Sequence, residues 1–385
     1  MIESLIYFYI LICISLILFN IAYVISKSIR NTTLEPRSTK FKKLFDEEVN
    51  TFKDTNEISS KYKQYLDEKL KRVRLLIVFQ HKIEKLQETE PELGKKFLEG
   101  IMPTIFGLHS SYNKKSNDEK AYFAYILSTL DYSNVKPNKQ IIDIMIDYLN
   151  VKSIYVNTNT MKAIYKMGDV KGMIRAIKVE DSSETFYHSK LLTDGLLTFS
   201  KDKEELNAEL WKILKTLTPE TQVAIIDYYR ICGADLKEEL IQFLKNEETD
   251  LEVKCSVIRY YTKYKHQEAL EILLDYVKDD ELGSWITKST SILALKNYEC
   301  NEVKEVLKKE LSSRNWFIRN NSAKVLTDWG LSEEDIMDVF KGEDKFAQEI
   351  FIYYLRDKAE ENELIEKIIG YLENKEKESQ MAKCC

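Results

Sequence analysis

The stretches Trp285-Ile286-Thr287-Lys288 and Trp316-Phe317-Ile318-Arg319 decide the fold, because the same pattern of residues follows both of them. Counted from Thr287 or Ile318, a serine lies four residues on, apolar side chains lie seven and eight residues on, and an aromatic ring lies eleven residues on. These positions share one face of an α-helix. The motif returns about every 31 to 34 residues, and a period of that length is typical of stacked supersecondary units.

Weaker copies of the motif lie on both sides of these two stretches, centred on Val156, His188, Val253 and Gln348. We expect a short turn and a second helix after each first helix, which makes about eight helical hairpins between residues 118 and 374. An isolated hairpin of this kind exposes its apolar stripe, and only stacked neighbours bury it. The sequence therefore predicts an all-α protein whose main part is an α-solenoid.

The motif also predicts where side chains lie within the array. Small residues should allow close approach of helices, and aromatic residues should fill the layers between repeats; these residues are Ser291, Ser322, Ala323, Tyr260, Tyr264, Tyr298 and Trp329. Trp316 and Leu326 are expected in the core between repeats. His188 occupies a first-helix core position, which predicts a packed histidine rather than an acid or base.

The first residues of the chain predict a membrane anchor. Leu5 to Ile25 holds no charged side chain, and about 20 apolar residues are needed to cross a bilayer. A signal peptide and a buried soluble helix are the alternatives, but no basic residue precedes the run and no small-residue cleavage site closes it. The cations that follow are Lys27, Arg30, Arg37, Lys40, Lys42 and Lys43, against the single acid Glu35. This bias predicts a single-pass membrane protein with its N-terminus outside and its body in the cytoplasm.

The predicted organisation has five parts. They are a transmembrane anchor at residues 1–26, a basic-then-acidic juxtamembrane linker at 27–57, a long helix and N-terminal cap at 58–117, the solenoid at 118–374, and a polar tail at 375–385. The linker is expected to be helical near Phe41 to Phe52. One long helix from Ser59 to about Gln87 would begin the array, or alternatively a coiled-coil dimer. Short helices are expected around residues 93–98 and 103–108.

The first-helix motif resembles that of the HEAT repeat, especially the short bacterial form related to phycobilin lyases. The residues that carry the resemblance are Trp316, Ile318, Arg319, Ser322, Ala323, Val325 and Leu326, with a second copy at Trp285, Thr287, Lys288, Ser291, Ala294 and Leu295. The cation of the motif is replaced by Asn157 and Ser189 in earlier copies. The resemblance implies a right-handed, armadillo-like solenoid that binds proteins. Some HEAT-like proteins are DNA glycosylases or chromophore lyases, so an enzyme is the less favoured alternative.

Signatures of chemistry are missing from the sequence. The four histidines are far apart, no phosphate-binding glycine motif occurs, and the six cysteines have no spacing typical of a disulfide or zinc site. With a formal net charge of -6 and second helices of mixed sign, the chain also lacks the basic surface that nucleic acid requires. We therefore expect no catalytic residue, no cofactor and no metal.

The function predicted from these features is a membrane-anchored cytoplasmic scaffold or adaptor for a protein partner. The alternative is an accessory subunit of a membrane enzyme complex, for example in polysaccharide synthesis or signalling. The predicted contacts of the chain are a protein, the membrane through its N-terminal helix, and anionic lipid at the basic flank, but not nucleic acid. The partner-binding residues are not assigned by the sequence, although exposed aromatic or arginine side chains on the second helices are expected to dominate the interface.

Overall fold

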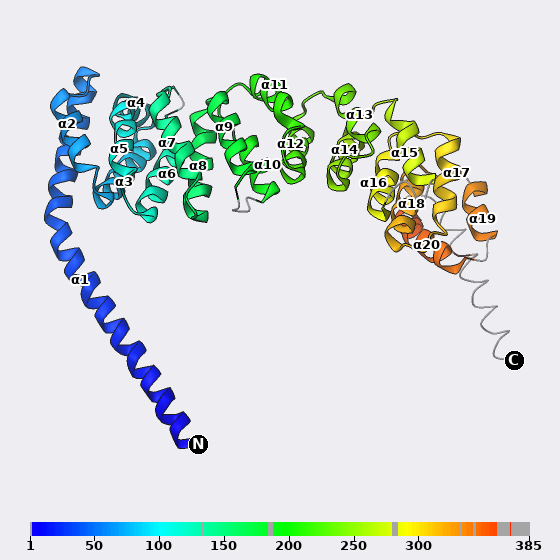
Figure 1. The fold of residues 1–385 in the computed structure, drawn as a ribbon, viewed down its shortest axis with the longest axis horizontal. Coiled ribbons are helices and arrows are strands. Elements are labelled where there is room, and N and C mark those ends of the chain that lie inside the picture. Colours follow the sequence, from blue (N-terminus) through cyan, green and yellow to red (C-terminus); the bar gives the residue numbers. More distant parts are fainter. Residues whose placement is uncertain are drawn as a thin grey trace. The chain divides into compact units, whose positions relative to one another are not determined.

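The computed structural model describes residues 2–132, 134–183, 188–278, 284–330, 333–341, 344–359 and 370, and all regular structure in these residues is helical (Figure 1). The prediction of an all-α protein is confirmed. The chain divides into two compact units, one of residues 1–186 with 198–203 and one of residues 187–197 with 204–385. This division falls within the predicted array. The predicted tail at residues 375–385 lies outside the described residues.

The first unit contains nine helices in its described part. They are α1 (Ile2–Thr55), α2 (Ser60–Lys69), α3 (Val73–Thr89), α4 (Pro91–Gly107), α5 (His109–Tyr112), α6 (Asn117–Thr129), α7 (Lys139–Leu149), α8 (Ile154–Met167) and α9 (Val170–Asp181). The second unit contains α10 (Ser189–Leu197), α11 (Lys203–Leu214), α12 (Pro219–Cys232), α13 (Lys237–Lys245), α14 (Leu251–Lys263), α15 (Ala269–Lys278), α16 (Trp285–Leu295), α17 (Asn301–Glu310), α18 (Trp316–Asp328), α19 (Glu333–Lys341) and α20 (Lys345–Ala359). Below, the even-numbered helices from α6 to α20 are called first helices and the odd-numbered helices from α7 to α19 second helices.

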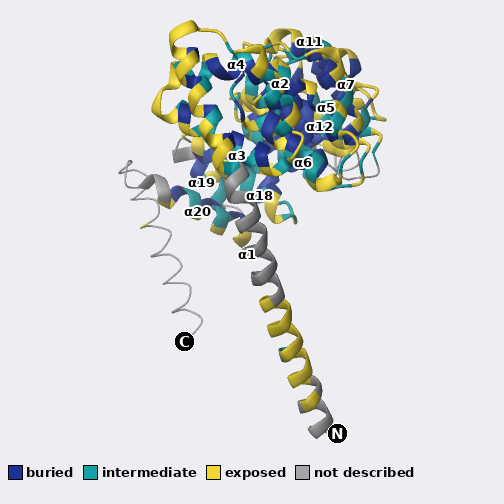
Figure 2. Ribbon diagram, turned by 90° about the vertical axis from the view of Figure 1, so that its left-hand side faces the viewer, coloured by how far each residue is buried: buried dark blue, intermediate teal, exposed yellow. Residues whose placement is uncertain are grey.

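The prediction of a single-pass membrane protein with an external N-terminus and a cytoplasmic body is wrong. In the part of the chain that the structure describes, no helix carries an apolar stretch long enough to cross a bilayer. A span needs about 20 consecutive apolar residues. The uncharged stretch is instead the beginning of the 54-residue helix α1, and the side chains that the structure describes in it are those of residue 7 and residues 9–21. Figure 2 shows these residues exposed along the ribbon.

The C-terminal part of α1 belongs to the core of the first unit, although it was expected to lie in a linker. Phe41, Phe45 and Phe52 are buried, and their spacing of four and seven residues puts them on one helical face. The Phe45 ring lies 6.2 Å from that of Phe79 and 5.5 Å from that of Phe97, measured between centroids. The edge-to-face geometry of both pairs is the one that aromatic rings prefer. Helix α1 is thus held against α3 and α4.

Two expectations for residues 58–117 need correction. The single long helix is two helices, α2 and α3, because the chain turns at residues 70–72. There the carbonyl of Leu70 accepts a hydrogen bond of 2.7 Å from the Tyr112 hydroxyl, which fixes the break in the buried interior. The two short helices are one helix, α4, with Pro103 inside it. A proline inside a helix removes one hydrogen bond, and burial of Ile101 and Ile105 around it offsets this loss.

Successive first helices of the second unit pack on one another, α12 on α14, α14 on α16, α16 on α18 and α18 on α20. At two places a tyrosine hydroxyl binds the turn that follows the preceding first helix. Tyr260 accepts a hydrogen bond from the Leu236 amide at 3.0 Å and donates one to the Ala234 carbonyl at 2.7 Å. Tyr298 accepts one from the His266 amide at 3.0 Å and donates one to the His266 carbonyl at 2.7 Å. The expected aromatic filling between neighbouring helices is confirmed for both tyrosines, which are buried.

The motif positions differ in how well their burial was predicted. Ser291, Ser322, Ala323 and Leu326 are fully buried, as expected. Trp316 was expected in the core, but 52% of its surface is exposed, because the buried position at the start of α18 is taken by Ile318. His188 was expected to pack in the core, but it is exposed just before α10, where its Nδ1 accepts a hydrogen bond from the Lys190 amide.

Candidate protein-interaction surface

Large exposed apolar side chains are distributed unevenly over the described helices. Outside α1 all of them lie on first helices; they are Tyr125, Ile154, Tyr155, Leu191, Ile231, Leu251, Trp285, Trp316, Phe317, Phe346 and Tyr353. None of the described second-helix residues belongs to this class. Of the exposed aromatic or arginine side chains expected on the second helices, the large aromatic ones are therefore not found in the described residues, whereas Arg175 of α9 is exposed. The reason is that the second helices have cleanly divided apolar and charged faces, and the apolar face is covered by their neighbours.

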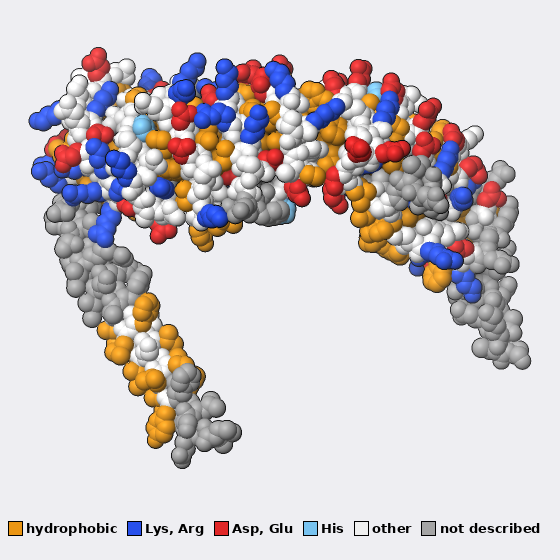
Figure 3. All heavy atoms as spheres, viewed as in Figure 1, with side chains coloured by type: hydrophobic (Ala, Val, Ile, Leu, Met, Phe, Trp, Pro, Cys, Tyr) orange, Lys and Arg blue, Asp and Glu red, His pale blue; other side chains and the backbone are white. Residues whose placement is uncertain are grey.

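Three of these side chains form a contiguous group, the aromatic cluster, which consists of Trp285, Trp316 and Phe317. The rings of Trp285 and Phe317 stack with centroids 5.2 Å apart and an interplanar angle of 21°. Trp316 packs edge-on against Phe317, again at 5.2 Å. Each side chain is about half exposed, at 47%, 52% and 50% in sequence order. Figure 3 shows hydrophobic side chains gathered on the surface over α16 and α18.

The cluster follows from how α16 and α18 begin. The Ser284 hydroxyl caps α16 by accepting from the amides of Ile286 and Thr287, and the Asn315 side chain caps α18 by accepting from the Phe317 amide. The tryptophan that follows each cap is the first helical residue. Side chains of a first helical turn tilt toward the N-terminus, beyond the packed part of the helix. The repeated tryptophan therefore points away from the core, and neighbouring copies meet at the surface.

Exposed apolar side chains also lie at the starts of the helices on either side of the cluster, and together with the cluster they are called the apolar row. Leu251 is the first residue of α14 and is exposed. Phe346 lies in the first turn of α20 and is 65% exposed. The Arg319 guanidinium lies 5.4 Å from the centroid of the Phe346 ring, a cation–π contact, and donates a hydrogen bond of 2.8 Å to the Ser313 carbonyl. The row thus extends over four consecutive first helices, and its centre is the aromatic cluster.

Acidic side chains are missing from the sequence segments that carry the cluster. Residues 284–298 and 311–327, which include all of α16 and most of α18, hold no aspartate or glutamate, although the chain has 63 such residues. Arg314 is exposed beside the cluster, and Arg319 is partly exposed. Lys288 is different, because it lies inside the helix pair and forms a 3.0 Å ion pair with Glu310 of α17. Only 8% and 9% of these two side chains are exposed, so this pair stabilises the interior rather than the surface.

The second helices present a different surface. A shallow groove of about 760 Å³ runs along α15 toward α13 and α17, and its walls include Lys245, Glu268, Lys278 and Glu302. Lys245 lies 3.4 Å from Glu268, and Lys278 lies 2.6 Å from Glu302. Exposed ion pairs of this kind contribute little to binding or stability. The groove has no convergent set of polar atoms around an apolar floor, which a small-molecule site requires.

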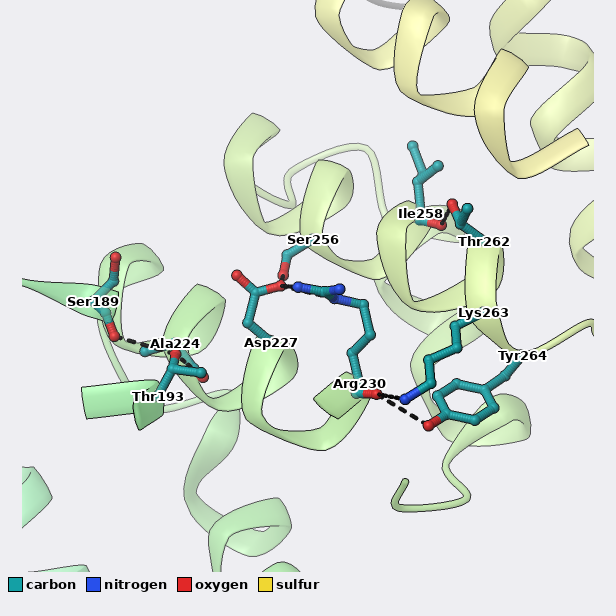
Figure 4. A network of polar contacts seen from close by, with 10 residues as sticks. All are labelled: Ser189, Thr193, Ala224, Asp227, Arg230, Ser256, Ile258, Thr262, Lys263 and Tyr264. Carbon is teal, nitrogen blue, oxygen red and sulfur yellow. Dashed lines mark hydrogen bonds and ion pairs between the residues drawn. The ribbon is translucent and has the colours of Figure 1, made fainter. Parts of the chain in front are cut away.

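A polar network joins α12 and α14 (Figure 4). One oxygen of the Asp227 carboxylate accepts hydrogen bonds from Arg230 Nε at 3.2 Å and Nη2 at 3.1 Å, and from the Ser256 hydroxyl at 3.2 Å. The Arg230 carbonyl accepts from Lys263 Nζ and from the Tyr264 hydroxyl, both at 3.0 Å. These contacts connect groups of α12 with groups of α14, so the network has a structural role in joining the two helices.

Titratable groups are not gathered into a catalytic arrangement in the described residues. No group of three or more histidine, cysteine, aspartate or glutamate side chains with metal-binding geometry occurs among them. Burial raises the pKa of Glu180 on α9 from 4.5 to about 7. Neither of its carboxylate oxygens has a hydrogen-bond partner, and acid–base catalysis requires a positioned reacting group. The four histidines stay apart in sequence and take no part in such a cluster.

Comparison of the chain with protein-family models gives no match, and comparison with curated proteins gives none either.

Proposed function

We propose that this protein is an adaptor that binds another protein through the aromatic cluster and carries out no chemistry of its own. The observation that carries the proposal is the exposure of three mutually contacting rings, Trp285, Trp316 and Phe317, on two adjacent first helices. Contiguous exposed apolar patches mark interaction sites on soluble proteins. Tryptophan is also among the residues that contribute most to protein–protein binding energy.

We infer further that residues 118–374 form a right-handed α-solenoid of about eight HEAT-like hairpins. Packing of each first helix on the next, from α12 to α20, supports this inference. So does packing of α13 on α15 and of α15 on α17. Tyr264 and Tyr298, which occupy equivalent motif positions, donate hydrogen bonds to the carbonyls of Arg230 and His266, and these bonds add a periodic contact of the kind expected between equivalent units. In a solenoid, equivalent positions of successive repeats line one edge, which suits an extended binding surface.

Photo-crosslinking tests the adaptor function. Phe317 is replaced by the photoreactive residue p-benzoylphenylalanine in the full-length chain, and the cells that naturally contain the protein are irradiated. We expect a discrete protein adduct that disappears when Trp316→Ala is added. The same replacement at Tyr155, an exposed residue of α8 outside the cluster, is the control and should give no such adduct. Absence of an adduct at position 317 contradicts the proposal, as does an enzymatic activity of the purified chain that is lost on changing one histidine or carboxylate.

A further inference from the structure

We infer that the partner of the aromatic cluster is an acidic, extended polypeptide segment with an apolar side chain at every third residue. This inference rests on the proposed adaptor function and adds the charge, the conformation and the spacing of the ligand. Its three supports are the charge around the cluster, the distance between neighbouring first helices, and the way in which the rings of the cluster already contact one another.

Charge complementarity at the aromatic cluster favours an acidic ligand, while Asp250 and Glu252 flank Leu251 at the far end of the row. The two stretches around α16 and α18, residues 284–298 and 311–327, hold no acidic residue. Arg314 is exposed, and Arg319 lies between the cluster and Phe346. The nearest acidic residue at the start of α20 is Asp344, whose carboxylate accepts hydrogen bonds from the amides of Phe346 and Ala347. Complementary charge at the rim of an apolar patch increases the association rate and excludes partners of the wrong sign.

The spacing of the row favours an extended ligand. Leu251, Trp285, Trp316 and Phe346 each lie in the first turn of consecutive packed first helices. Packed helices have axes roughly 8–10 Å apart, so adjacent anchors of the row are separated by about that distance. Three residues of an extended chain cover about 10 Å, and one turn of polyproline II covers about 9 Å. A single turn of an α-helix advances only about 5.4 Å. Side chains alternate between the two faces of a β-strand but return to the same face at every third residue of polyproline II. An extended segment in the polyproline II conformation can therefore place one apolar side chain beside each helix start.

The ring contacts favour a polypeptide over a single-stranded nucleic acid. Nucleobases bind by stacking on open aromatic faces, together with cations that follow the phosphate backbone. Trp285 and Phe317 already stack on each other, and the edge of Trp316 contacts Phe317. The outer edges and remaining faces of the rings are left for aliphatic side chains, and the two indole N–H groups can donate hydrogen bonds to carbonyl oxygens.

Fluorescence anisotropy with the purified full-length chain tests the inference. The probes are fluorescein-labelled peptides of twelve residues: one with leucine at every third position and acidic residues between, one with lysine in place of the acids, and one acidic peptide with its leucines consecutive. A labelled oligothymidine is the fourth probe. We expect the first peptide to bind at least tenfold more tightly than each of the other three probes. Trp316→Ala and Trp285→Ala should each weaken its binding at least tenfold, and Arg314→Glu should weaken it several-fold.

Tyr155→Ala is the matched control, because Tyr155 is an aromatic residue of a first helix outside the row and is 75% exposed. This substitution should leave binding unchanged. Thermal unfolding followed by circular dichroism should show that Trp316→Ala stays folded with only a small loss of stability, since the side chain is half exposed. The inference is overturned if the basic peptide, the consecutive-leucine peptide or the oligothymidine binds as tightly as the first peptide, or if no peptide binds. A crosslinked partner whose contact segment is basic or helical would leave the adaptor function standing and remove only this inference.

Discussion

The buried ion pair between Lys288 and Glu310 should be a strong determinant of stability in the second unit, and Lys288→Met tests this. The Nζ–Oε2 distance is 3.0 Å, and less than a tenth of either side chain is exposed. With an effective dielectric constant of about 20, two unit charges at this distance attract by roughly 5 kcal/mol. Removing the lysine leaves the Glu310 carboxylate buried without this partner. Loss of one member of a buried pair costs about 3–5 kcal/mol.

The double variant Lys288→Met with Glu310→Leu separates the attraction between the two charges from the free-energy cost of burying them. Replacing both charges by apolar side chains of similar volume is often close to neutral, so we expect the double variant to recover most of the lost stability. The surface pair of Lys245 and Glu268 supplies the control, because these side chains are 56% and 65% exposed at 3.4 Å. Lys245→Met should cost less than about 0.5 kcal/mol.

Hydrogen exchange of residues 284–311, read by mass spectrometry, is the appropriate assay for this pair. It measures local opening and does not require the two compact units to unfold together. Lys288→Met should speed exchange in that segment by at least a hundredfold, which corresponds to about 3 kcal/mol, and the double variant should return it toward the wild-type rate. If exchange in Lys288→Met matches that in Lys245→Met, the pair does not stabilise the interior and the reasoning fails.

Three further outcomes can be measured by denaturation or exchange. Gly168→Ala should destabilise its surroundings by at least 1 kcal/mol more than Gly233→Ala does, as read by hydrogen exchange around each glycine. Both glycines have positive φ, 64° and 85°, but a Cβ at residue 168 would lie 2.2 Å from Lys201 Cγ, whereas one at residue 233 has its nearest neighbour at 3.6 Å. Equal losses would show that the close approach has no cost. The pKa of Glu180 is about 7 in the folded state and 4.5 when the chain is unfolded, so the folded state binds more protons between these pH values. Stability should therefore fall as pH rises through this window, by at most about 3 kcal/mol. Glu180→Gln should remove this slope from a series of urea titrations, and an unchanged slope would contradict the assignment. Tyr298→Phe should cost about 1–3 kcal/mol, because the amide and carbonyl of His266 both lose their hydrogen bonds to the hydroxyl. Amide exchange at residues 264–269 should therefore accelerate. Protection as in the wild type would show that the hydroxyl does not stabilise this turn.

The sequence by itself determined that the protein is helical and which motif recurs along it. Helical periodicity is a local property, because the residues at spacings of four, seven and eight share one face whatever the rest of the chain does. Burial of Ser291, Ser322 and Leu326 follows from this periodicity and was predicted correctly. The helical character of residues 41–52 was also predicted, but their place in the core was not, since it depends on contacts with Phe79 and Phe97 far along the chain.

Only the tertiary structure decided which motif positions are exposed and can contact a partner. The repeated tryptophan, a large apolar residue, was expected in the core, yet its position in the first helical turn lies beyond the contact with the neighbouring helix. Likewise, the motif identifies Lys288 as a cation but not Glu310 as its partner, because the turn between α16 and α17 sets that pairing. Exposure of Trp285 and Trp316, and hence the candidate surface, depends on how successive helices stack, and that arrangement is the sum of contacts between residues distant in the sequence.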